Sequence, residues 1–99
     1  MHMLSYDQQA LAELCRQHRI RRLSLFGSVL KRTDRPDSDV DLLVEFDPDA
    51  VPGYFRLARI EADLSELLGG RRVDLRTPQD LSRYFRDQVL REAEVQFVA

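Results

Sequence analysis

The chain has 99 residues, of which 43% are hydrophobic and 32% charged, and its formal net charge is −2. These values are typical of one soluble globular domain covering residues 1–99, and the slightly acidic balance argues against stable direct nucleic-acid binding. We see no secretory signal and no membrane-spanning stretch, so a cytoplasmic protein without membrane association is expected. The single cysteine, Cys15, excludes an internal disulfide and falls on an apolar helix stripe, which favours a buried side chain over a reactive thiol.

The first half of the chain predicts a helix followed by two strands. Ser5 and Gln8 have the spacing of a capping box, and apolar residues then recur at helical intervals as far as His18. A lone histidine at a helix end is more often structural than a ligand. Residues 20–26 and 39–46 alternate as strands do, the second most clearly.

The second half predicts a helix, a short strand and a longer helix. Residues 54–68 carry an apolar stripe and end at two glycines, and residues 72–76 form a short strand. Thr77 is a suitable cap for a helix that continues to about residue 94. Residues 95–98 form either a short strand or a frayed end. The expected core contacts of the last helix are Leu81, Phe85, Val89 and Ala93.

The order of these elements predicts the fold class. Two consecutive strands joined by a loop favour an antiparallel pair, and the third strand follows a helix, so the sheet is expected to be mixed. The sequence therefore predicts an α+β domain in which helices pack on one face of a small mixed β-sheet.

Three aspartates are the candidate chemical groups. Asp39 and Asp41 lie two residues apart on one strand and therefore share a face, opposite the apolar residues. Asp74 alternates away from the core in the same way on its own strand. Carboxylates this close repel one another, and hard divalent cations such as Mg²⁺ prefer such oxygen ligands. Two ions held there could clamp a displacement at phosphorus.

Two other interpretations compete with a magnesium site. Aspartates beside strands are commonly solvated loop ends, and a short doublet is weak evidence alone. An EF-hand calcium loop is excluded, because Leu42 and Pro48 stand where that loop needs glycine and glutamate.

A glycine-serine turn precedes the aspartates. Gly27 and Ser28 follow the first strand, where a small residue lets backbone amides approach a phosphate and the hydroxyl can donate a hydrogen bond. Alone, this dipeptide is an ordinary turn. Its weight comes from the spacing, because ten residues separate Ser28 from Asp39.

With that spacing, the chain resembles the minimal nucleotidyltransferase family of the DNA polymerase beta-like superfamily. The resemblance rests on residues 25–28, 36–44, 72–75 and 89–93 and covers nearly the whole chain. It implies a nucleotidyltransferase fold like the polymerase beta palm. It also implies an antitoxin that transfers AMP from ATP to a tyrosine of a HEPN-family ribonuclease toxin, with which it forms a hetero-oligomer.

The resemblance also implies roles for individual residues. Asp39, Asp41 and Asp74 would be catalytic and would bind Mg²⁺, with Asp41 or Asp74 helping to deprotonate the attacking hydroxyl. Gly27 and Ser28, with Lys31, would hold the triphosphate.

The segment after Ser28 departs from the family pattern. Relatives commonly continue with arginine, alanine, arginine and glycine, whereas this chain has Val29, Leu30, Lys31 and Arg32. Lys31 keeps a positive charge but lacks the planar fork of a guanidinium, which suits phosphate. The rate and the nucleotide preference are the properties that this change affects.

Two alternatives remain open beside protein adenylylation. One is an antitoxin that masks its toxin by binding alone, and the other is a nucleotidyltransferase for a small hydroxylated molecule. Retention of all three aspartates weighs against the first, and the lack of a second domain to hold a small substrate weighs against the second.

Overall fold

The computed structural model describes residues 6–27, 39–50 and 52–99. In chain order, the elements are α1 (Gln8–Gln17), β1 (Ile20–Phe26), β2 (Val40–Phe46), α3 (Tyr54–Leu67), β3 (Val73–Arg76), the 3₁₀ turn η1 (Pro78–Asp80), α4 (Arg83–Glu92) and β4 (Glu94–Val98). None of the helices in these ranges combines the length and apolarity that crossing a bilayer requires.

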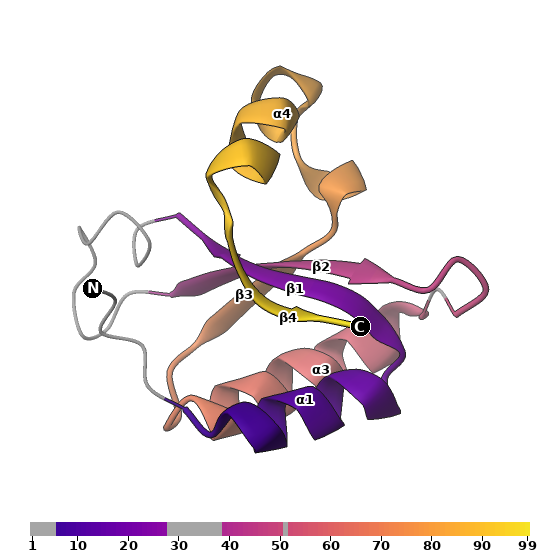
Figure 1. The fold of residues 1–99 in the computed structure, drawn as a ribbon, viewed down its shortest axis with the longest axis vertical. Helices are drawn as coiled ribbons and strands as arrows, with labels where there is room; N and C mark the ends of the chain where they lie inside the picture. Colours follow the sequence, from indigo (N-terminus) through magenta and orange to yellow (C-terminus); the bar gives the residue numbers. More distant parts are fainter. Residues whose placement is uncertain (1–5, 28–38, 51) are drawn as a thin grey trace.

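The four strands form one mixed sheet in the order β3-β2-β1-β4 (Figure 1). β1 pairs antiparallel with both β2 and β4, and β2 pairs parallel with β3. The predicted antiparallel pair and the mixed α+β sheet are confirmed. The last residues do form a strand, β4, which lies at one edge of the sheet.

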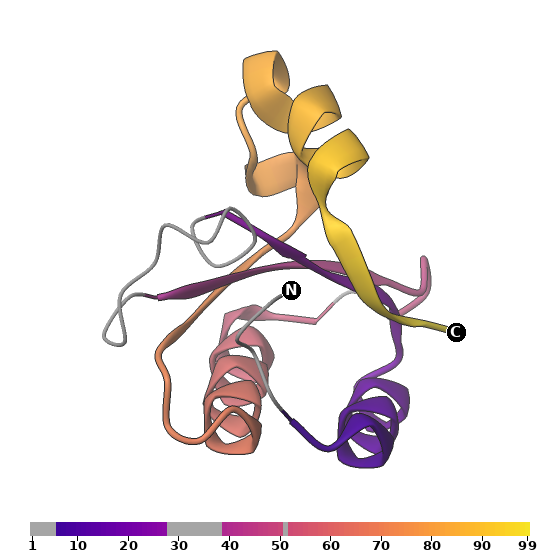
Figure 2. The same ribbon diagram turned by 60° about the vertical axis from the view of Figure 1, so that its left-hand side comes forward.

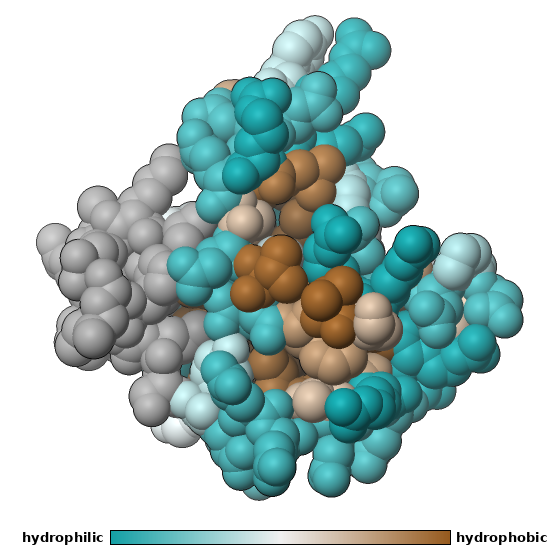
Figure 3. Space-filling view, in the orientation of Figure 1, coloured by the Kyte–Doolittle hydropathy of each residue, from teal (hydrophilic) through white to brown (hydrophobic). Residues whose placement is uncertain are grey.

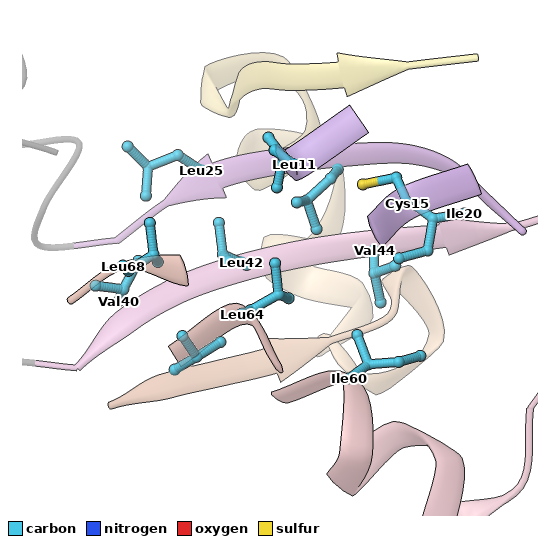
Figure 4. Packing of buried hydrophobic residues seen from close by; sticks show 12 residues of the cluster. Leu11, Cys15, Ile20, Leu25, Val40, Leu42, Val44, Ile60, Leu64 and Leu68 are labelled. Carbon is cyan, nitrogen blue, oxygen red and sulfur yellow. The ribbon is translucent and has the colours of Figure 1, made fainter. Parts of the chain in front are cut away.

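α1 and α3 cover the same face of the sheet (Figures 1 and 2). Ile60 and Leu64 of α3 and Cys15 of α1 have no exposed surface, and they pack with the alternating apolar residues of β1 and β2 (Figure 4). Cys15 is therefore the buried small side chain that the sequence predicted. His18 closes α1, and its Nε2 lies 3.3 Å from Asp63 Oδ2 of α3, so it connects the two helices.

The start of α1 differs from the prediction. Its N-cap is Asp7, whose Oδ1 accepts hydrogen bonds from the backbone N–H groups of Gln9 at 2.9 Å and Ala10 at 3.4 Å. An aspartate is as good a cap as a serine and also suits the positive end of the helix dipole. Ser5, the predicted cap, lies outside the described residues.

The predicted long C-terminal helix is broken in two. Thr77 donates its N–H to Asp80 Oδ2 at 3.1 Å and starts η1, but Leu81 and Ser82 turn extended. Ser82 then caps α4, because its Oγ accepts the N–H of Tyr84 at 3.3 Å.

The expected core contacts of this helix are wrong. α4 contains no buried residue, and Phe85 is 62% exposed. α4 stands on the side of the sheet away from α1 and α3, so its apolar side chains do not reach the core (Figures 1 and 2). Figure 3 shows apolar surface gathered over β4 below α4, where Val95 and Val98 are half exposed.

Candidate functional site

The parallel pairing of β2 with β3 brings two of the predicted aspartates together. Val40 faces Val73 in the register, and Asp41 faces Asp74 in the next position. Because both valines are buried in the core, alternation sends both aspartates to the opposite face. Asp39 immediately precedes β2. The predicted neighbourhood of the two strands is therefore present, and it brings Asp41 and Asp74 to facing positions, with Asp39 next to them in sequence.

The charges in this group act on one another. Burial raises the pKa of Asp41, and the carboxylates of Asp74 and Asp39 raise it further, as does a hydrogen bond with Asp74. The guanidinium of Arg76 acts in the opposite direction. The site thus concentrates more negative charge than it neutralises around Asp41, which is the central residue of the three.

Two arginines act as counterions. Both Nε and Nη2 of Arg76 lie 3.3 Å from Asp74 Oδ2, so the guanidinium fork meets one carboxylate oxygen. Nε of Arg72 lies 3.8 Å from Asp39 Oδ1. Neither arginine was among the predicted site residues, although Arg76 is two residues after Asp74 and shares its strand face.

The donor chemistry fits a hard divalent cation. Within residues 6–27, 39–50 and 52–99, no three His, Cys, Asp or Glu side chains are already arranged as metal ligands. Nevertheless, the two facing aspartates and Asp39 offer only carboxylate oxygens. Burial and then the charges of Asp74 and Asp39 raise the pKa of Asp41, and a bound cation would relieve both effects. Arg72 and Arg76 supply part of that positive charge in this structure.

Gly27 lies directly against Asp41. Its φ is +80°, and a Cβ built on it would overlap Asp41 Oδ2 and lie 2.9 Å from Asp41 Cγ. The pairing of Phe26 with Asp41 in the β1–β2 register explains this closeness. The sequence assigned Gly27 a phosphate-binding role, and the structure adds a second reason for glycine, which is room for the central carboxylate.

The other predicted phosphate-binding residues cannot be placed. Ser28 and Lys31 lie outside the described residues, as does the whole segment that departs from the family pattern. The described part of the predicted site is therefore Gly27 with Asp39, Asp41 and Asp74.

Comparisons of the sequence with known proteins agree with one another. Residues 9–98 match the family described as Polymerase beta, Nucleotidyltransferase. Protein adenylyltransferase MntA of Thermococcus cleftensis is 36% identical over 80 residues, which cover 81% of this chain and 78% of that protein. A protein of Methanocaldococcus jannaschii assigned as a protein adenylyltransferase is 34% identical over 77 residues, covering 78% of this chain and 80% of that protein.

Solved structures with a similar fold include a nucleotidyltransferase and a toxin-antitoxin complex. One described as a minimal nucleotidyltransferase aligns with a TM-score of 0.71 and 41% identity, over 87% of this chain and 85% of that chain. A toxin-antitoxin structure with AMP-PNP aligns with a TM-score of 0.73 over 94% of this chain and 74% of that chain. Its identity is 20%, so that likeness concerns the fold alone.

Proposed function

This chain belongs to the polymerase beta nucleotidyltransferase family, and we propose that it transfers AMP from ATP to a tyrosine of a cognate HEPN-family toxin and thereby acts as its antitoxin. Two relatives above 30% identity are named or assigned as protein adenylyltransferases, which supports a protein acceptor. Among its structural neighbours are toxin-antitoxin complexes, one of them with the ATP analogue AMP-PNP. These features favour ATP as the nucleotide and a hetero-oligomer with the toxin.

The single observation that carries the proposal is the facing pair of Asp41 and Asp74 on parallel strands. With Asp39, they would hold Mg²⁺, which when bound offsets phosphate charge and polarises the reacting phosphoryl group. The turn at Gly27 would place backbone N–H groups at the β- and γ-phosphates, so that pyrophosphate leaves in line with the attacking oxygen.

Asp74 is the best-placed residue to receive the acceptor. It lies on β3, an edge strand of the sheet, and its side chain is 36% exposed. The Asp41 carboxylate, by contrast, lies against Gly27, and Asp41 is on the inner strand β2. In this proposal, a carboxylate oxygen of Asp74 accepts the proton of the tyrosine hydroxyl as its oxygen bonds to the α-phosphorus and the bond to pyrophosphate breaks.

The test is adenylylation of the cognate toxin. The protein is incubated with its proposed cognate HEPN toxin, ATP and Mg²⁺, and the toxin is weighed by intact mass spectrometry. We expect a gain of one or more AMP units that is lost with Asp41→Asn and Asp74→Asn but retained with Asp49→Asn, which changes an exposed loop carboxylate. A tyrosine-to-phenylalanine change at the modified position of the toxin should abolish the gain.

The masking antitoxin gives a different result in the same experiment. Its support is that the described carboxylates are paired with arginines rather than assembled as a metal-binding cluster. A toxin that is inhibited at equal molar ratio, stays unmodified and is inhibited equally by Asp41→Asn would establish masking and refute the transfer.

A further inference from the structure

We infer that Arg76 is an exchangeable counterion that pairs with Asp74 in the resting protein and moves to the triphosphate when nucleotide binds. Arg76 would thus be a nucleotide-binding residue as well as the counterion of Asp74. The inference rests on the proposed function, because it concerns the nucleotide of that site.

To exchange between Asp74 and a nucleotide, Arg76 has to lie on the same face of the sheet as the aspartate pair, and it does. Asp74 and Arg76 alternate to the same face of β3, and Arg76 faces Leu43 in the β2–β3 register, two positions beyond the Asp41–Asp74 pair. Two nitrogens of the guanidinium contact one Asp74 oxygen, and its charge reaches Asp41 as well. Arg76 is therefore beside the Asp41–Asp74 pair, where the α-phosphate end of a bound nucleotide would lie in the proposed function.

The present ion pair is weak enough to be exchanged. The side chains of Arg76 and Asp74 are 48% and 36% exposed, and both contacts are long for a charged hydrogen bond, at 3.3 Å. Pairs between exposed groups contribute little, since water screens them. A guanidinium has five N–H donors in a planar fork that fits phosphate oxygens, so triphosphate offers it better partners than one carboxylate oxygen does.

Arg72 does not lie beside the Asp41–Asp74 pair in the same way. Its side chain is 82% exposed, it precedes β3, and its Nε lies 3.8 Å from Asp39. It therefore contacts the outer aspartate rather than the facing pair. The different placement of the two arginines makes the assignment of Arg76 specific.

An exchangeable counterion has two effects of opposite sign. In the absence of nucleotide, Arg76 competes with a cation for Asp74, so Arg76→Gln should tighten binding of Mn²⁺ alone by about two- to fivefold. In the presence of Mn²⁺, the same change should weaken binding of α,β-methylene-ATP by about tenfold, because a charged contact to phosphate is lost. Arg76→Lys should leave Mn²⁺ binding near that of the wild type and restore only part of the nucleotide affinity.

The experiment is calorimetric titration of purified wild-type and variant proteins, first with MnCl₂ and then with α,β-methylene-ATP at fixed Mn²⁺. Arg19→Gln is the matched control, because Arg19 is 53% exposed, pairs with Asp49 at 3.0 Å and stands at the end of β1 opposite Gly27. It should change neither affinity. Melting curves confirm that each variant is folded.

The outcomes separate this inference from the proposed function. If the wild-type protein binds Mn²⁺ and nucleotide but Arg76→Gln alters neither, or weakens both, the counterion exchange is refuted while the enzyme assignment stands. If the wild-type protein binds neither ligand, the proposed function itself fails. Opposite changes in the two affinities support the exchange, whatever acceptor the enzyme uses.

Discussion

At the scale of single residues, the site depends on how closely Gly27 and Asp41 approach each other. The positive φ of Gly27 is a conformation that L side chains rarely adopt, and the space a Cβ would need is filled by the Asp41 carboxylate. Asp41 also faces Asp74 in the β2–β3 register, and the negative charge of Asp39 acts on it as well. The glycine at position 27 therefore leaves room for a carboxylate that two other carboxylates repel.

The first prediction is that Gly27→Ala lowers the free energy of unfolding by more than backbone strain alone would. Gly69→Ala is the control, because Gly69 has a similar φ of +75° but nothing within 4 Å of an added Cβ. We expect Gly69→Ala to cost about 1 kcal/mol of the free energy of unfolding, and Gly27→Ala to cost about 1–3 kcal/mol more. Urea denaturation measures both values.

Gly27→Ala should also abolish nucleotide binding in the folded protein, because the Asp41 carboxylate has to move. Titration with α,β-methylene-ATP and Mn²⁺ below the unfolding transition checks this. Equal stabilities of the two variants, with normal affinity for nucleotide, would show that Asp41 is not held against Gly27.

The second prediction concerns the pH dependence of stability. Because the pKa of Asp41 is raised in the folded state, its ionised form destabilises the fold above that pKa, and this penalty disappears as the pH falls through the folded pKa towards the unfolded value. In metal-free, low-salt buffer at pH 7, Asp41→Asn should therefore stabilise the protein by about 0.5 kcal/mol.

The gain should shrink as the pH is lowered into the acidic range in which the wild-type Asp41 carboxyl becomes protonated as well. Denaturation series at several pH values measure it. Asp49→Asn is a control of opposite sign, since it removes a favourable contact with Arg19 at 3.0 Å. A destabilised Asp41→Asn at pH 7 would contradict the role assigned to repulsion.

At the scale of elements, α4 is less well anchored in the core than α1 and α3. It has no buried residue, whereas α1 and α3 each contribute buried residues to the core. Arg86 ties α4 to the preceding turn: its Nε donates to the carbonyl oxygen of Pro78 at 2.8 Å and its Nη2 donates to that of Leu81 at 3.1 Å. Side chain to backbone bonds, rather than apolar packing, set the direction of this helix.

The third prediction is that α4 opens more readily than the other helices. Backbone amides of residues 83–92 should exchange with deuterium faster than those of α3, because α4 contributes no buried side chain whereas α3 buries Ile60 and Leu64. Arg86→Ala should accelerate exchange in η1 and α4 while lowering global stability by less than about 1 kcal/mol. Hydrogen-exchange mass spectrometry and urea denaturation measure the two effects.

Gln88→Ala is the matched control, because the Nε2 of Gln88 donates to Glu92 Oε1 at 3.2 Å within α4 and not to the preceding turn. It should leave exchange in η1 unchanged. Protection of α4 equal to that of α3 would mean that other contacts hold the helix.

At the scale of the whole molecule, stability comes from one core between the sheet and the two helices α1 and α3. Leu64 and Ile60 are fully buried there, and so is Cys15, whose burial raises the pKa of its thiol to about 12. The thiol is thus both inaccessible and protonated at neutral pH. Because it is the only cysteine in the chain, it reports on opening of the core.

The fourth prediction is that Cys15 reacts with a disulfide reagent only when the core opens. Labelling at pH 8 should be slow and should follow the global unfolding equilibrium across a urea series. Leu64→Ala should cost about 2–5 kcal/mol and accelerate labelling accordingly, while Leu90→Ala, at a 40% exposed position of α4, should change it little. Fast labelling of the wild-type protein without urea would show that the core opens locally.

Local patterns in the sequence were enough to predict β1, β2 and α3 closely, because alternation and helical periodicity depend on neighbouring residues. They also placed Asp39, Asp41 and Asp74 away from the core. The break at Leu81 and Ser82 and the exposure of α4 could not be read in this way, since an amphipathic stripe looks the same whether or not a partner surface covers it. The cap at Asp7 was missed because Ser5 offered an equally good local pattern.

What the sequence determined by itself is which side chains share a face within each strand, and hence that the three aspartates are available for chemistry. Only the tertiary structure decided that Asp74 faces Asp41 across the β2–β3 pair, that Gly27 leaves room for Asp41, and that Arg76 meets Asp74. The reason is physical: side-chain alternation is fixed by the geometry of one strand, whereas register and neighbouring strands are fixed by how α1, α3 and the sheet bury their apolar residues together.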